Sequence, residues 1–333
     1  MPWTYALLAL SFVMILAGAF TFTNAVEWAG VRLGLGHAAV GSVLAAVATA
    51  LPESTIPVIA ILSGEQAGQI AIGAIVGAPF LLATLGMIVV GASAVLARGR
   101  REQGTRLRLH RASTVRDLAV FLVLLAVALL LGVLDVGKVV HVVAAVLFVL
   151  AYGVYVWRTV TRGGEAGQEE DPSGLFFDPS KNNPPRNVQI VLQVVVSLAL
   201  IVGGAELFVT EVEHVAHALG VTALVLALAL APLASELPEK LNSVLWVRQG
   251  KDSLALGNIT GAMVFQTAIP VAIGMVFVSW RLEPAALLAM ACALVGGALA
   301  LVNIWFVRRF TVPWLLGWLV LYGGVVTYLF TAA

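Results

Sequence analysis

Two glutamates that follow prolines are the residues of this sequence best suited to chemistry. Glu53 ends the run Ala-Thr-Ala-Leu-Pro-Glu, and Glu239 ends the run Ala-Ser-Glu-Leu-Pro-Glu, both within long apolar stretches. A charged side chain at the centre of a membrane helix costs about 2.5–3.5 kcal/mol on insertion scales. Each glutamate must therefore gain a compensating interaction, such as a bound cation or a proton.

The neighbouring residues add oxygen atoms to these two carboxylates. Pro52 and Pro238 each lack a backbone N–H and disturb the preceding helical turn, which frees carbonyl oxygens near Thr49 and Ser235. We therefore expect both helices to be interrupted at these motifs, with the two glutamates close together. Carboxylates, carbonyls and two hydroxyls form an all-oxygen cage that suits a hard cation such as calcium. The alternative is two protonated, hydrogen-bonded glutamic acids with a structural role.

Three further polar residues extend the candidate site. Glu236 and Lys240 are four residues apart, the helical spacing at which a carboxylate meets an ammonium group. They form either a mutually neutralising pair or a site in which Glu236 is a third carboxylate ligand and Lys240 tunes or replaces a bound cation. Asn258 is either part of the ligand shell or the donor of a capping or interhelical hydrogen bond.

Composition indicates which elements must position these residues. The 333 residues are 60% hydrophobic and 11% charged, whereas soluble domains are about 45–50% apolar and about 25% charged. The sequence therefore predicts an all-α integral membrane protein. We expect ten spanning helices, with the N-terminal apolar run as the first span rather than a removable signal. They lie near residues 4–31, 37–63, 67–97, 117–134, 138–158, 188–210, 219–247, 254–280, 284–307 and 311–331.

The distribution of lysine and arginine predicts the orientation of these helices. Sixteen of the 19 basic residues fall on loops of one side, seven of them in the segment from Arg98 to Arg116. Cytoplasmic loops of membrane proteins carry this excess. We therefore expect a protein of the cell (plasma) membrane with both termini outside.

An internal repeat divides the chain into two halves. Besides the Leu-Pro-Glu run, each half has a later Gly-x-x-x-Gly motif, at Gly73 and Gly77 and again at Gly257 and Gly261, which favours close helix packing. The two glutamates are five spans apart, and an odd offset reverses the direction of crossing. The prediction is two inverted five-helix repeats, residues 1–160 and 188–333, joined by a cytoplasmic linker at 161–187. Inverted repeats of this kind place a substrate site near the membrane midplane in many transporters.

The doubled motif resembles the repeats of the sodium/calcium exchanger family, in the cation/calcium antiporter superfamily. That family's repeat reads approximately Gly-Thr-Ser-Leu-Pro-Glu, then a half-helix, then Gly-Asn-x-x-Gly-Ser-Asn-x-Phe-Asn/Asp. The copies here are residues 48–53 with 73–78, and residues 234–239 with 257–262. Ten helices with outside termini match as well, so the resemblance covers the whole chain.

The resemblance implies roles for several residues. Glu53 and Glu239 would be the central calcium ligands, and Thr49 and Ser235 would supply backbone and hydroxyl oxygens. Gln266 stands at a later Asn/Asp position of the repeat and is similar to a glutamine of the superfamily's calcium/proton branch.

Departures from the family's repeat bear on the coupling ion. Serines that help to hold sodium correspond to Ala78 and Ala262, and a later Asn/Asp position corresponds to Leu82. Sodium is a hard cation that requires oxygen ligands, so proton coupling competes with sodium coupling. We expect calcium flux to depend weakly on sodium and more on pH.

These observations predict a secondary active cation antiporter that exchanges a divalent cation, most simply calcium, for sodium or protons. It would need no cofactor, because the ions are its substrates. Its partners would be inorganic cations and membrane lipid, and the net charge of +1 suggests no nucleic acid. The alternatives are a channel or a transport-inactive, repurposed exchanger fold, which the Glu236–Lys240 pair would fit, and an intramembrane hydrolase. Against the hydrolase, the sequence lacks the serine–histidine or His-Glu-x-x-His arrangement that such an enzyme would use.

Overall fold

Ten helical segments make up the described part of this membrane protein. The computed structural model describes residues 2–32, 45–64, 67–134, 136–161, 174–178 and 185–331. Within these ranges, eight segments are long and apolar enough to span a membrane, and two more, α3 and α9, contain the shorter apolar stretches Glu53–Leu62 and Ala223–Glu236. The segments are α1 (Pro2–Arg32), α3 (Ala45–Leu62), α4 (Gly68–Leu81) continued by the π-helix η3 (Leu82–Gly86) and α5 (Met87–Leu96), α6 (Arg111–Val133), α7 (Lys138–Thr161), α8 (Asn187–Leu219), α9 (Ala223–Arg248), α10 (Asp252–Phe277), α11 (Pro284–Val302) continued by the π-helix η4 (Asn303–Val307), and α12 (Val312–Thr331). The predicted ten-helix membrane fold is confirmed.

Two of these helices extend beyond the apolar runs that predicted them. α6 begins at Arg111 rather than near residue 117, and α8 continues to Leu219 rather than ending near residue 210. Helical hydrogen bonding does not depend on apolar side chains, so a helix continues into polar sequence until a stop signal. In α8 this signal is Gly220, which adopts a left-handed conformation at φ +70°. Thr222 then caps α9 by accepting a hydrogen bond from the Val225 N–H at 3.3 Å.

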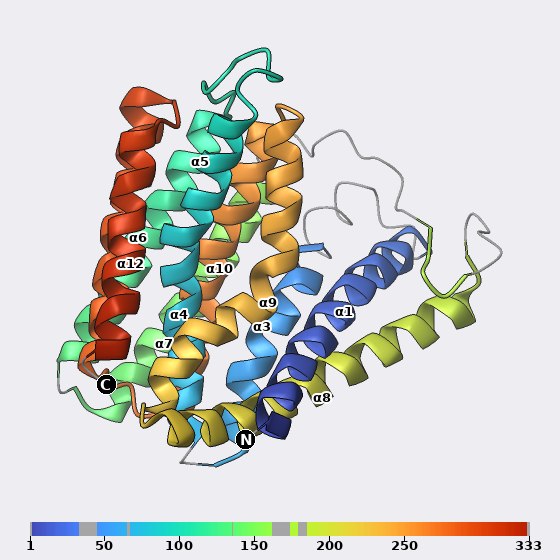
Figure 1. The fold of residues 1–333 in the computed structure, drawn as a ribbon, viewed down its shortest axis with the longest axis vertical. Coiled ribbons are helices and arrows are strands. Elements are labelled where there is room, and N and C mark those ends of the chain that lie inside the picture. Colours follow the sequence, from blue (N-terminus) through green and yellow to red (C-terminus); the bar gives the residue numbers. More distant parts are fainter. Residues whose placement is uncertain are drawn as a thin grey trace.

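The helices that carry the Leu-Pro-Glu motifs are not interrupted, and that part of the prediction is wrong. α3 and α9 each continue as a single helix through Pro52 and Pro238. An interior proline removes one backbone hydrogen bond and kinks the axis, while the turns on either side can stay helical. α9 changes direction along its length (Figure 1).

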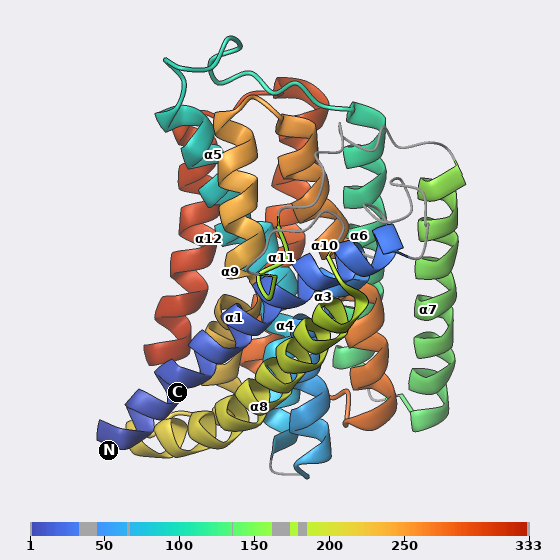
Figure 2. The ribbon, with the colours of Figure 1, turned by 90° about the vertical axis from the view of Figure 1, so that its right-hand side faces the viewer.

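The crossing of α1 and α8 reveals the two-fold relation between the halves. A Cβ atom on Gly18 would lie 2.8 Å from the Ile201 side chain, and one on Gly204 would lie 2.9 Å from the Ile15 side chain. Gly18 and Gly204 are 186 positions apart in the sequence, and so are Ile15 and Ile201. The same offset separates Glu53 from Glu239. Figures 1 and 2 show α1 and α8 side by side, slanting across the more upright helices. The two glycines permit this close approach because they lack a side chain.

The helix α4 lies at the centre of the bundle and is buried along nearly all of its length. Its glycines pack against α9, since a Cβ on Gly73 would lie 2.6 Å from the Leu224 carbonyl oxygen and one on Gly77 would lie 2.5 Å from that of Leu228. The predicted packing role of these two glycines is confirmed, and the helix they contact is α9. No described atom lies within 4 Å of a Cβ placed on Gly257 or Gly261.

Both chain ends lie at one end of the bundle, and the segment between α5 and α6 lies at the other (Figure 1). An even number of spans requires the termini to share a side. The segment between α5 and α6 is the most arginine-rich of the chain, so the structure gathers these positive charges at the end opposite the termini.

Candidate cation site

The first predicted ligand, Glu53, is held in the second span by α3. Its side chain is 7% exposed, so the bundle removes this carboxylate from solvent almost completely. The backbones of Thr49 and Glu239 belong to α3 and α9, but their side chains lie outside the described residues. The meeting of the Glu53 and Glu239 carboxylates therefore stays a prediction.

A buried network of three polar side chains joins α9 to α10. Glu236 is 0% exposed, Lys240 5% and Gln266 0%. One Glu236 oxygen accepts a hydrogen bond from the Lys240 ammonium, one helical turn away. The other accepts a hydrogen bond from the Gln266 Nε2 amide at 2.8 Å. The contact between Glu236 and Lys240 that the helical spacing predicted is present, while a ligand role of Glu236 stays a prediction.

The amide of Gln266 has a second atom that bears on ion binding. Its Oε1 oxygen is buried and has no hydrogen-bond partner among the described residues. A buried acceptor without a partner loses the hydrogen bonds that water would give it, which costs about 1–3 kcal/mol. An arriving cation or a protonated carboxyl group can satisfy this oxygen, so Gln266 can link the ion pair to a ligand.

The hydroxyl and amide groups predicted near the site make hydrogen bonds of their own. Ser235 Oγ donates to the Ala231 carbonyl oxygen of its own helix at 3.2 Å. Asn258 Nδ2 donates across to Ser243 Oγ at 3.3 Å, linking α10 to α9. Of the two alternatives for Asn258, the interhelical hydrogen bond is therefore present, while the ligand role stays a prediction.

The positions that the resemblance matches to sodium-holding serines, Ala78 and Ala262, carry methyl groups. Ala78 on α4 is 8% exposed, and Ala262 on α10 is half-buried. Neither side chain can offer an oxygen to a cation. Among the described side chains, no three histidine, cysteine or acidic residues gather into a ready-made metal site.

A further buried carboxylate, that of Asp117, was not predicted. It lies near the start of α6 with 3% exposure, and its Oδ1 accepts a hydrogen bond from the neighbouring Arg116 guanidinium at 3.1 Å. Its Oδ2 accepts one from Thr260 on α10 at 3.1 Å. The apolar run marked Asp117 as a boundary residue, so its burial was missed. The signal that could have found it is the Arg-Asp pair directly before that run.

The chain belongs to the sodium/calcium exchanger protein family, which it matches over residues 3–161 and 189–331. It is therefore a membrane exchanger and not an enzyme. It is 25% identical over 268 residues to an uncharacterized membrane protein of Methanocaldococcus jannaschii, covering 80% of each chain. It is also 26% identical over 123 residues to a protein of Alkalimonas amylolytica named as the antiporter CaxA, covering 37% of this chain and 39% of that protein.

Two solved structures share the fold. The H+/Ca2+ exchanger CAX superimposes with a TM-score of 0.73 at 18% identity, covering 99% of this chain and 85% of that chain. The sodium-calcium exchanger NCX_Mj, soaked with 10 mM Na+ and zero Ca2+, superimposes with a TM-score of 0.61 at 20% identity, covering 98% of each chain.

Proposed function

We propose that this protein exchanges calcium for protons across the plasma membrane, with its basic loops in the cytoplasm and both termini outside. The observation that carries the proposal is the buried Glu236–Lys240 pair with its Gln266 partner. Of the two solved structures, CAX is named an H+/Ca2+ exchanger and NCX_Mj is named a sodium-calcium exchanger. Because both share the fold, the choice of counter-ion depends on the side chains at the site.

Charge balance supports calcium as the transported cation. Glu236 and Lys240 neutralise each other, so Glu53 and Glu239 contribute the net negative charge of the proposed site. A divalent cation balances two carboxylates, and calcium accepts six to eight oxygen ligands at about 2.3–2.6 Å. The Gln266 Oε1 oxygen is a further neutral ligand of the type that calcium accepts.

The same residues favour protons as the counter-ion. Once calcium leaves, two unbalanced carboxylates within the membrane are costly, and protonation neutralises them without further ligands. Sodium would need several oxygens to replace its water shell, whereas Ala78 and Ala262 offer methyl groups. Protons can therefore complete the exchange cycle where sodium has too few ligands.

Calcium uptake by purified protein in liposomes tests this proposal. Vesicles that are acidic inside should take up calcium, and vesicles loaded with sodium at equal pH should take up little. Glu53→Gln and Glu239→Gln should each abolish uptake. Glu283→Gln is the matched control, since Glu283 is exposed and lies at the start of α11. Uptake that requires sodium and is unchanged between pH 6 and pH 8 would overturn proton coupling.

A second candidate is a transport-inactive protein with an exchanger fold. Lys240 favours it, because a buried ammonium beside a site carboxylate can act as a resident cation. In that case calcium would neither bind nor cross the membrane under either gradient in the wild-type protein, while removal of Lys240 together with Glu236 would restore binding.

A further inference from the structure

The arginine-rich segment between α5 and α6 forms one wall of a basic pocket. A cavity of about 800 Å³ opens at this end of the bundle, between that segment and the end of η4. Three arginines line it, Arg106 and Arg108 from the segment and Arg308 from beyond η4, together with two polar and three apolar residues: Glu102, Gln103, Leu107, Phe306 and Val307. From sequence, the arginine-rich segment indicated orientation first and a lipid contact second. The structure gathers the three arginines around one space.

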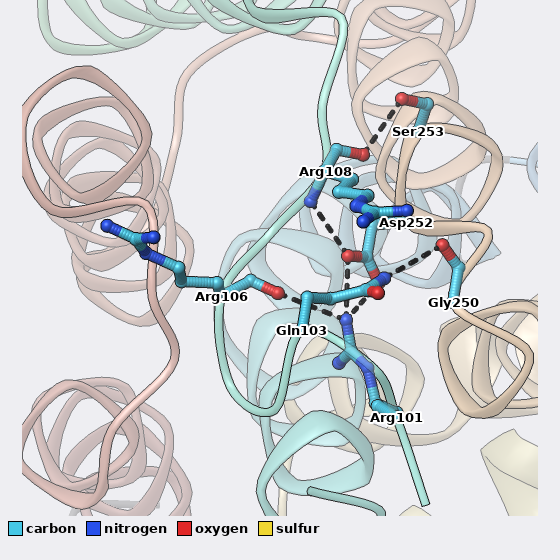
Figure 3. Close-up of polar contacts among 7 residues, drawn as sticks. All are labelled: Arg101, Gln103, Arg106, Arg108, Gly250, Asp252 and Ser253. Atoms are coloured by element: carbon cyan, nitrogen blue, oxygen red, sulfur yellow. Dashed lines mark hydrogen bonds and ion pairs between the residues drawn. The ribbon is translucent and has the colours of Figure 1, made fainter.

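A buried ion pair holds the segment that bears Arg106 and Arg108. The Arg101 side chain is fully buried, and its Nη2 donates to both carboxylate oxygens of Asp252, at 2.6 and 2.7 Å (Figure 3). The same nitrogen donates to the Arg106 carbonyl oxygen at 3.2 Å. The Arg108 N–H donates to Asp252 at 2.9 Å. These contacts hold the backbone that bears two of the pocket arginines against the start of α10.

The third arginine, Arg308, is held by backbone pairing and has a strained backbone conformation. The Leu107 N–H donates to the Arg308 carbonyl oxygen at 3.0 Å, and the Phe310 N–H donates to the Thr105 carbonyl oxygen at 3.2 Å. Arg308 itself has φ +51° and, among the described residues, it is the non-glycine residue with positive φ. Such a conformation persists where surrounding contacts impose it, and it is often found at binding sites. Arg308 lines the same cavity as Arg106.

The charges and the apolar rim of the pocket match an amphipathic anion. Glu102 also lines the pocket and lies 3.8 Å from the Arg108 guanidinium, so the three arginines leave an excess of positive charge. In η4, Trp305 and Phe306 are exposed, the latter at 75%, and Phe306 also lines the pocket. Aromatic residues occupy this level of a membrane helix, where headgroups meet acyl chains.

We propose that this pocket binds the phosphate headgroup of an anionic phospholipid, with the acyl chains running along Phe306. Arginine binds phosphate oxygens through two parallel N–H donors, which makes it well suited to this group. Basic pockets between helices at the cytoplasmic face are known to take such headgroups. A free phosphate ion shares the headgroup chemistry but would gain nothing from the exposed aromatic rim.

Native mass spectrometry and thermal unfolding test the proposal without reference to calcium transport, so it stands or falls separately from the exchange activity. Phosphatidylglycerol added to the detergent-solubilised protein should remain bound and raise Tm, whereas phosphatidylcholine should not. The double variant Arg106→Gln/Arg308→Gln should bind phosphatidylglycerol roughly tenfold more weakly or worse, as expected from the loss of charge-assisted hydrogen bonds. Arg98→Gln/Arg100→Gln is the matched control, because both residues are exposed in the same segment but lie outside the pocket lining.

Three results would overturn the proposal. The control variant would bind as weakly as the pocket variant if the attraction were diffuse. Inorganic phosphate alone would raise Tm as much as the lipid if the ligand were a free anion. If no headgroup site existed, phosphatidylglycerol and phosphatidylcholine would raise the Tm of the wild-type protein equally, a comparison that needs no variant. Arg308→Lys, which keeps the charge, should show an intermediate affinity.

Discussion

Glu236 and Lys240 form a buried ion pair within a single turn of α9, and Gln266 of α10 donates a hydrogen bond to the remaining carboxylate oxygen. The chain departs from its family's repeat at this pair. The pair brings a positive and a negative charge into the membrane together and leaves the net charge of the proposed site unchanged. Its energetic role can be separated from any ligand role by substitution.

Removing one member of the pair should be more damaging than removing both. Lys240→Met leaves the Glu236 carboxylate buried without its counter-charge, which costs about 3–5 kcal/mol of stability. The double variant Glu236→Ser/Lys240→Leu removes both charges and should be considerably closer to wild type in unfolding experiments. If the single variant unfolds normally and the double variant loses calcium transport, Glu236 acts as a direct ligand instead.

Gln266 should stabilise the pair through its hydrogen bond. Gln266→Leu removes a donor to a charged oxygen, which costs about 1.5–3 kcal/mol, and it also removes the unpartnered Oε1, which offsets part of that cost, so a smaller net loss of stability is expected. Thr267→Val is a suitable control, since the neighbouring Thr267 hydroxyl bonds only the Met263 carbonyl of its own helix in the described structure. Equal loss of stability in both variants, measured by thermal unfolding in detergent, would contradict a specific role for the amide.

The glycines of α4 should tolerate no side chain. Gly77→Ala would place a Cβ 2.5 Å from the Leu228 carbonyl oxygen, and forced overpacking of this kind typically costs about 1–3 kcal/mol. Gly324→Ala on α12 is the matched control, because no described atom lies within 4 Å of its Cβ position. We expect Tm to fall for the first variant and to stay level or rise slightly for the second. Similar values for both would show that α4 and α9 can separate at little cost.

The Arg101–Asp252 pair should hold the loop between α5 and α6 in place. Asp252→Ala leaves the fully buried Arg101 guanidinium without its partner, and about 3–5 kcal/mol of destabilisation is expected. Limited trypsin digestion should then cut between Arg98 and Arg111 faster than in wild type. Asp252 variants that resist trypsin as well as wild type does would mean that the backbone pairing with Arg308 and Phe310 is sufficient.

The sequence predicted the fold well because its signals are local and repeated. Apolar runs indicated ten spans, and the doubled Leu-Pro-Glu motif indicated the inverted halves that Gly18 and Gly204 display at their crossing. Helix ends were less predictable, since α6 and α8 continue into polar sequence. The continuity of α3 and α9 was also missed, because a proline affects one turn without ending the helix.

Contacts between distant segments could not be predicted in the same way. The Glu236–Lys240 pair followed from helical spacing alone, but the hydrogen bond from Gln266 requires α10 to pack beside α9. Asp117 and Thr260 are 143 residues apart, and Arg101 and Asp252 are 151 apart. In each case neither residue alone indicates its partner, because the helix packing decides which side chains meet.

The central claim is that calcium and protons use the same carboxylates in turn. The most direct test records both ions at once in sodium-free liposomes, with a calcium indicator and a pH indicator inside the vesicles. Calcium entry should coincide with loss of internal protons, and both signals should disappear together in Glu53→Gln and in Glu239→Gln. Calcium entry without proton exit, or proton exit that persists in these variants, would contradict the shared site.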